Sequence, residues 1–160
     1  MKKLVCILKM NTKIKQISFQ KEFIPLIENG IKTVTRRIHT NLQKGDIAYF
    51  KAGRTGKKEG YIKILRVSKE RLQDLYRDRG YYAIERELQR EGIEGIEVEE
   101  GIIDFQNLWN RINKKENSWE NNPEVYRIKF EYIGKEVKIK YGKLSTGEDV
   151  WLKEIKKEGK

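Results

Sequence analysis

Residues 29–37 read NGIKTVTRR, and this stretch decides how the chain around it is interpreted. The preceding residues 23–30, FIPLIENG, predict a short helix, because Pro25 is tolerated in a first turn and Gly30 suits a left-handed helix end. The β-branched residues that follow predict an extended segment over residues 32–38. Lys32 then lies just beyond the helix, where the negative end of the helix dipole favours a cation.

The extended segment carries an unusual mixture of hydroxyls and cations. In a regular strand, Thr33, Thr35 and Arg37 point to one side. Lys32 and Arg36 point to the other, although a twist or bulge would bring Lys32 toward the Thr35 hydroxyl. Arginine forks bind phosphate or carboxylate, and threonine hydroxyls add donors. The segment therefore predicts an anion-binding strand, and the alternative is an exposed sheet edge that charge protects from further pairing.

The composition describes one ordinary, strongly basic domain. The chain has 160 residues, of which 38% are hydrophobic and 37% charged, and its formal net charge is +11. This length suffices to bury a core. The positive field predicts RNA or a nucleotide as partner. The alternative is a composition bias of the kind that high growth temperature selects.

Several classes of protein are excluded by what the sequence holds. One cysteine, Cys6, allows no intramolecular disulfide or thiolate cluster, and one histidine, His39, allows no site that needs two. We therefore expect no metal and no cofactor. The longest apolar run, LVCIL at residues 4–8, is too short to cross a bilayer or form a signal-peptide core. A cytoplasmic location without a membrane partner is predicted, and Met10 is an alternative start.

The rest of the chain mixes strands with helices. The predicted strands are residues 14–19, 61–67 and 124–133, with a hairpin at 136–152. The segment 42–50 has a turn at 44–46 and then enters a further predicted strand. Predicted helices begin after Ser68, cover residues 81–92, and begin again after Asp104. Such strands cannot all be parallel. The sequence therefore predicts an α+β domain on a small, barrel-like sheet with inserted helices.

Residues 30–37, GIKTVTRR, resemble the signature of the ASCH domain family, a β-barrel group related to PUA domains. Further segments resemble the family in the same order: QKGDIAYF at 43–50, GYIKILRVSKERLQDL at 60–75, QREG at 89–92, LWNRIN at 108–113 and SWENNPEVYRIKFE at 118–131. The resemblance implies a PUA-like fold over residues 14–133. Residues 1–13 are then an N-terminal extension, and residues 134–160 are a C-terminal hairpin with a basic tail, packed on this domain or appended to it.

The resemblance implies two kinds of function. ASCH domains are regarded mainly as RNA-binding modules, whereas one branch hydrolyses N4-acetylcytidine with a lysine, a threonine and a glutamate. By motif position these are Lys32, Thr35 and Glu91. As chemistry, Thr35 would attack the acetyl carbonyl, Lys32 would take its proton, and Glu91 would orient the lysine. A neighbouring carboxylate raises a lysine pKa, so burial must outweigh it, or the pair must share a proton.

Other candidates lie outside the signature. Arg54, Lys57 and Lys58 belong to a Gly-rich loop that favours phosphate contact, the alternative being an ordinary solvated loop. Trp119, in the polar stretch SWENNP, either fills the core or offers a stacking surface for a base. Trp109 lies on a helical apolar stripe and is predicted to be core.

Overall fold

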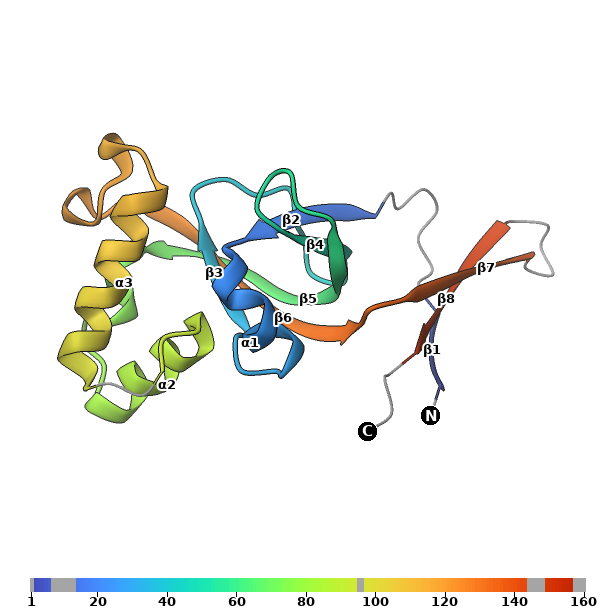
Figure 1. Cartoon of the computed structure of the whole chain (residues 1–160), viewed down its shortest axis with the longest axis horizontal. Helices are drawn as coiled ribbons and strands as arrows, with labels where there is room; N and C mark the ends of the chain where they lie inside the picture. The colour runs from blue at the N-terminus through green and yellow to red at the C-terminus, as the bar shows by residue number, and fades with distance from the viewer. Residues whose placement is uncertain (1, 7–13, 95–96, 144–148, 157–160) are drawn as a thin grey trace.

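The computed structural model of the chain describes residues 2–6, 14–94, 97–143 and 149–156. The predicted alternative start at Met10 and the end of the basic tail lie outside these residues. The strands are β1 (Lys2–Cys6), β2 (Lys15–Phe19), β3 (Val34–Arg37), β4 (Ile47–Ala52), β5 (Lys58–Arg71), β6 (Glu124–Gly134), β7 (Val137–Lys143) and β8 (Asp149–Lys156). The helices are α1 (Ile24–Glu28), α2 (Tyr81–Glu91) and α3 (Val98–Ile112). Figure 1 shows α2 and α3 together beyond one end of the main sheet.

The main sheet has five strands in the order β2-β4-β5-β6-β3. β2 and β4 are parallel, and the other neighbours are antiparallel. This mixed sheet confirms the predicted α+β class. No backbone pairing among the described residues joins β2 to β3, so a closed barrel is not confirmed. The sheet nevertheless curls: the rings of Phe19 in β2 and Phe130 in β6 lie 5.6 Å apart, although two strands separate β2 from β6 in the order.

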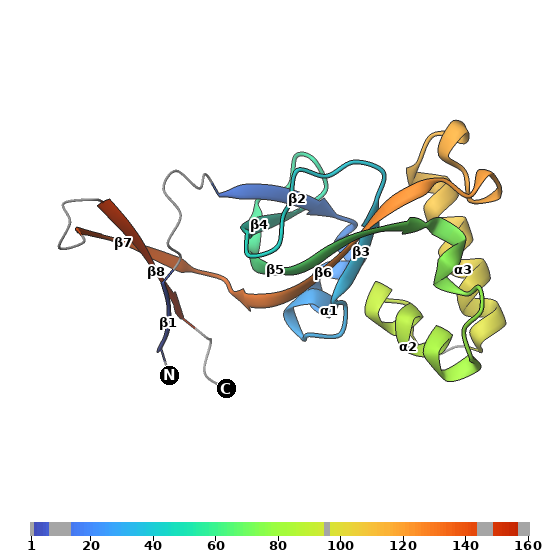
Figure 2. The ribbon, with the colours of Figure 1, turned by 180° about the vertical axis from the view of Figure 1, so that it is seen from behind.

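Two apolar clusters hold this fold together. The first fills the curl of the sheet and includes Phe19, Ile27, Phe50 and Phe130. The second lies between α2, α3 and the start of β6, and includes Trp109. Figure 2 shows the two helices from behind, beside the ends of β5 and β6. The space between the two clusters contains the site described below.

A second, three-stranded sheet has the order β1-β8-β7. β7 and β8 form the predicted C-terminal hairpin. β1 pairs with β8, with Lys2 opposite Lys156 and Cys6 opposite Leu152. The N-terminal extension thus contributes a strand to the C-terminal hairpin, while the boundaries of the domains stay a prediction. No helix in the described ranges is both long and apolar enough to span a bilayer.

Two helix starts predicted from local signals are wrong. Ser68 begins no helix, because β5 continues through it, opposite Arg127, and ends at Arg71. Pairing along the whole of β6 outweighs the capping preference of one serine, which the sequence alone does not reveal. α3 begins at Val98 rather than after Asp104, and the buried side chain of Val98 extends the helix's apolar face by two turns.

Gly92, at the end of α2, packs closely against Phe23, which directly precedes α1. It has a φ of 93°, and a Cβ there would lie 2.9 Å from the Phe23 ring. We expect Gly92→Ala to lower the free energy of unfolding by about 2 kcal/mol, because the left-handed backbone and the ring both resist the methyl group. Urea denaturation measures this. The matched control is Gly80→Ala, where nothing lies within 4 Å, and equal losses in the two variants would contradict the account.

Candidate functional site

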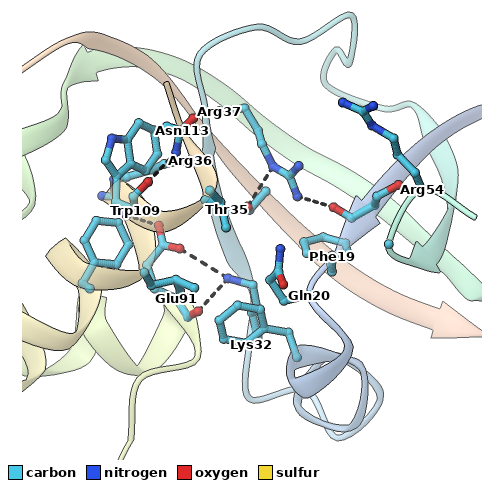
Figure 3. A pocket seen from close by; sticks show the side chains of 16 residues that line it. Phe19, Gln20, Lys32, Thr35, Arg36, Arg37, Arg54, Glu91, Trp109 and Asn113 are labelled. Carbon is cyan, nitrogen blue, oxygen red and sulfur yellow. Dashed lines mark hydrogen bonds and ion pairs between the residues drawn. The ribbon is translucent and has the colours of Figure 1, made fainter. Parts of the chain in front are cut away.

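A cavity of about 330 Å³ lies between β2, β3, the start of α1 and the C-terminal half of α3 (Figure 3). Its polar lining includes Ser18, Gln20, Lys32, Thr35, Arg36, Arg37, Arg54, Glu91 and Asn113. Its apolar lining consists of Phe19, Phe23, Phe105, Leu108, Trp109 and Ile112. Apolar walls with a few convergent polar groups, at this size, are typical of small-molecule sites. The three residues predicted to be catalytic, Lys32, Thr35 and Glu91, all line it.

Lys32 is turned into the cavity by the end of α1. Gly30 has a φ of 74°, and the backbone N–H of Lys32 donates to the Leu26 carbonyl at 3.1 Å. The side chain is 3% exposed. Its Nζ donates to the backbone oxygens of Glu91 at 2.6 Å and Val34 at 2.8 Å, and to Glu91 Oε2 at 3.3 Å. The lysine is therefore fixed at three points without solvent.

The pKa of Lys32 is the outcome of two opposing effects. Burial lowers it, whereas the charge of Glu91 and the hydrogen bond to that carboxylate raise it. Burial is the larger effect, and it brings the pKa from 10.5 to about 8. The requirement that burial outweigh the neighbouring carboxylate is thus met. A substantial fraction of Lys32 is neutral slightly above physiological pH.

Arg36 is directed away from external anions by carboxylates of the protein. Its fully buried guanidinium donates through Nε to Glu70 Oε1 at 2.7 Å and through Nη2 to Glu87 Oε1 at 2.8 Å. Nη1 donates to Glu91 Oε1. Burial acts to lower the pKa of Arg36, but the attraction of these carboxylates raises it above its usual range. The structure corrects the anion-binding role predicted for Arg36, which instead holds Glu91 beside Lys32.

Glu87 is the functional candidate that the sequence analysis missed. Its carboxylate is 1% exposed and lies among arginines from three elements. Arg127 of β6 donates to both oxygens at 2.8 and 3.1 Å, while Arg90 and Arg79 approach to 3.2 and 3.8 Å. Burial acts to raise the pKa of Glu87, but Arg127 and Arg36 lower it to about 2. The signal in the sequence was the spacing of Glu87 and Glu91, which places both on one face of a helix.

Thr35 and Arg37 belong to β3 and also line the cavity (Figure 3). Thr35 is 5% exposed, and its Oγ1 accepts a hydrogen bond from Arg37 Nε at 3.3 Å. Arg37 Nη2 donates to the Ser18 carbonyl at 2.6 Å and so bridges the unpaired edges of β3 and β2. Burial lowers the pKa of Arg37, and Glu91 offsets this only in part. Within the described chain, Lys32 Nζ bonds to Val34 and Glu91 and not to Thr35.

The basic loop is divided between the cavity and the outer surface. Arg54 lines the cavity. Lys57 is exposed and is not part of the lining. Lys58 begins β5, where its Nζ donates to the Tyr61 hydroxyl at 3.0 Å. Of the three predicted loop cations, the structure therefore brings only Arg54 to the site.

Two other candidate residues have structural contacts. Of the two alternatives for Trp119, the structure has the core position: the residue is 5% exposed and stacks on Tyr76 at 5.7 Å. This corrects its assignment as a stacking surface for a base, because the polar stretch hides a ring that fills the second cluster. Thr33 lies outside the cavity lining, and its backbone N–H donates to the Arg90 carbonyl at 2.9 Å.

No family model and no curated protein matches the sequence. Among solved structures, an Enterococcus faecalis V583 protein of family model DUF984 matches with a TM-score of 0.54 and 10% identity, over 78% of this chain and 84% of that one. A mutant of the ZmASCH protein from Zymomonas mobilis matches with a TM-score of 0.45 and 15% identity, over 77% and 71%. The first likeness shows that the chain shares the fold of the DUF984 protein. In the described ranges, no group of three or more His, Cys, Asp or Glu residues is arranged to hold a metal.

The contacts of Glu87 predict how stability depends on its charge. Glu87→Gln removes the carboxylate that pairs with Arg127 and one of the three that pair with Arg36, so we expect the free energy of unfolding to fall by about 3 kcal/mol at pH 7. Glu85→Gln on the same helix is the matched control, with little expected change. Because the folded-state pKa of Glu87 is depressed to about 2, its contribution is complete above about pH 4.5 and is lost as pH falls toward 2. Denaturation at several pH values should show the difference from wild type shrinking over that range, and a constant difference would contradict this.

Proposed function

We propose that the chain is an amidohydrolase that removes the acetyl group from the exocyclic nitrogen of a nucleobase, with N4-acetylcytidine as the expected substrate. The supporting observation is the buried Lys32, with a pKa of about 8, in the same cavity as the Thr35 hydroxyl. A general base works best when its pKa lies near the working pH, and a hydroxyl nucleophile needs such a base.

The reaction follows from these groups. Neutral Lys32 takes the hydroxyl proton as Thr35 Oγ1 attacks the acetyl carbonyl, whose oxygen becomes the oxyanion of a tetrahedral intermediate. Lys32 then returns the proton to the departing nitrogen, the carbon–nitrogen bond breaks, and cytidine leaves an acetyl ester on Thr35. Water, deprotonated by Lys32, attacks this ester. Acetate leaves, and the threonine hydroxyl is restored with its proton.

The other residues of the cavity have supporting roles in this proposal. Glu91 holds the lysine through its carboxylate and its backbone oxygen, at 3.3 and 2.6 Å. Phe19, Phe23 and Trp109 provide flat apolar walls for a pyrimidine ring. These walls also limit the access of water, which strengthens the electrostatic contacts of the reacting groups.

A second candidate function is binding of RNA or a nucleotide in the same cavity without turnover. The net charge of +11 and the position of Arg37 and Arg54 on the cavity favour it. In that case cytidine is not released from N4-acetylcytidine, while binding of the nucleoside persists after Lys32 is replaced.

Turnover of N4-acetylcytidine tests the proposed roles of the threonine and the lysine. We expect wild type to release cytidine, and Lys32→Ala and Thr35→Ala each to lower kcat by at least about 100-fold, because each removes the base or the nucleophile. Cytidine is measured by chromatography. Thr33→Ala is the matched control with wild-type activity, since Thr33 lies outside the cavity lining. Full activity in Thr35→Ala would remove the threonine from the mechanism.

The pH dependence of the reaction tests the proton carried by Lys32. Only the neutral amine acts as a base, so kcat/KM should rise as the pH passes through about 8 and level off above it. Glu91 raises the pKa of Lys32, and Glu91→Gln should therefore move this rise to lower pH. Initial rates between pH 6 and 10 measure both. A profile that is flat from pH 7 to 9 would show that Lys32 is not the base.

A further inference from the structure

We propose that the substrate of this cavity carries a phosphate on its ribose, and that Arg54, supported by Arg37, binds that phosphate. The inference rests on the proposed function for the orientation of the nucleobase. It adds a ribose phosphate to the class of substrate. It also distinguishes Arg54 from the other cations predicted at the site.

The balance of charge in the cavity is the first argument. Lys32 pairs with Glu91, and Arg36 pairs with Glu70, Glu87 and Glu91. Among the described residues, no carboxylate lies within ion-pair distance of Arg37 or Arg54. The reacting end of the cavity is thus neutralised by the protein, whereas the other side has an excess of positive charge. An anionic group of the ligand would complete the pairing.

The position of Arg54 is the second argument. Gly53 donates its backbone N–H to the Phe19 carbonyl at 2.9 Å. Gly56 is packed so closely that a Cβ would lie 2.1 Å from the Ala52 oxygen. These contacts hold the loop against β2, next to the Ser18 carbonyl that receives Arg37. Figure 3 shows Arg37 and Arg54 along the same side of the cavity, away from Lys32.

The shape of a nucleoside supplies the third argument. In cytidine, the exocyclic N4 and the ribose lie at opposite ends of the pyrimidine ring. When the acetyl group lies at the buried Lys32 and Thr35, the ribose must point toward the exposed end of the cavity. Arg54 is exposed and lines this same cavity, so it is suited to meet a phosphate on that ribose. A guanidinium matches the fork geometry of a phosphate.

Binding of product nucleotides tests the inference without relying on turnover. Isothermal titration calorimetry compares cytidine, cytidine 5′-monophosphate and a short single-stranded oligocytidine RNA, each against wild type, Arg54→Met and Lys57→Met. We expect the monophosphate to bind wild type at least about tenfold more tightly than cytidine, since the phosphate adds charge-assisted hydrogen bonds. Arg54→Met should abolish this gain. Lys57→Met, which removes a charge from the same loop outside the cavity, should retain it.

The oligocytidine RNA shows whether the phosphate belongs to an RNA strand or to a free nucleotide. An Arg54-dependent gain that is larger for the oligonucleotide than for the monophosphate assigns the subsite to the backbone of an RNA strand. An equal or smaller gain assigns it to a free nucleotide. Equal affinity for cytidine and its monophosphate, a gain that survives Arg54→Met, or no binding of any ligand would overturn the inference.

The binding measurement and the turnover assay test the phosphate subsite and the proposed hydrolase separately. If the protein releases cytidine from N4-acetylcytidine but the phosphate adds no affinity, the proposed hydrolase stands and the proposed phosphate subsite is wrong. If the phosphate adds affinity that depends on Arg54 but the protein releases no cytidine, the phosphate subsite stands and the proposed hydrolase is wrong.

Discussion

The structure depends on a buried chain of alternating charges that runs from Lys32 through Glu91 and Arg36 to Glu87. Each member is almost without solvent, so each needs the charge beside it, and the loss of one leaves its neighbour uncompensated. Glu87 and Glu91 belong to α2, whereas Lys32 and Arg36 belong to β3 and the residues before it. The chain of charges therefore fixes the helix on the edge of the sheet.

The same arrangement links stability to chemistry. Arg36 occupies one oxygen of Glu91, and the other oxygen faces Lys32. The lysine thus meets a carboxylate that is already partly neutralised, in surroundings that disfavour any charge. The effect of burial on the pKa of Lys32 then exceeds the opposing effect of Glu91, and this pKa falls to about 8. A lone lysine at the surface has the wrong pKa for a base, and the proposed activity follows from the buried network around it.

Much of this site was predictable from the sequence, and the remainder required the fold. Gly30 and the β-branched run indicated where Lys32 and Thr35 would lie, the resemblance to the ASCH signature added Glu91, and all three line one cavity. Glu87 was not predicted, because a glutamate in ERELQRE resembles a solvated helix face until β6 brings Arg127 to it. Arg36 was interpreted as a ligand for external anions for the same reason. The partners of a buried charge come from distant segments, and local patterns do not identify them.

The central claim is that Lys32 is held close to neutrality, and nuclear magnetic resonance measures this directly. The protein is labelled with ¹³C at the lysine Cε, and the Lys32 signal is assigned from its absence in Lys32→Arg. Its chemical shift is then followed from pH 6 to 11. We predict a midpoint of about 8. A midpoint near the ordinary value of 10.5 would mean that Glu91 outweighs burial, and it would contradict the account.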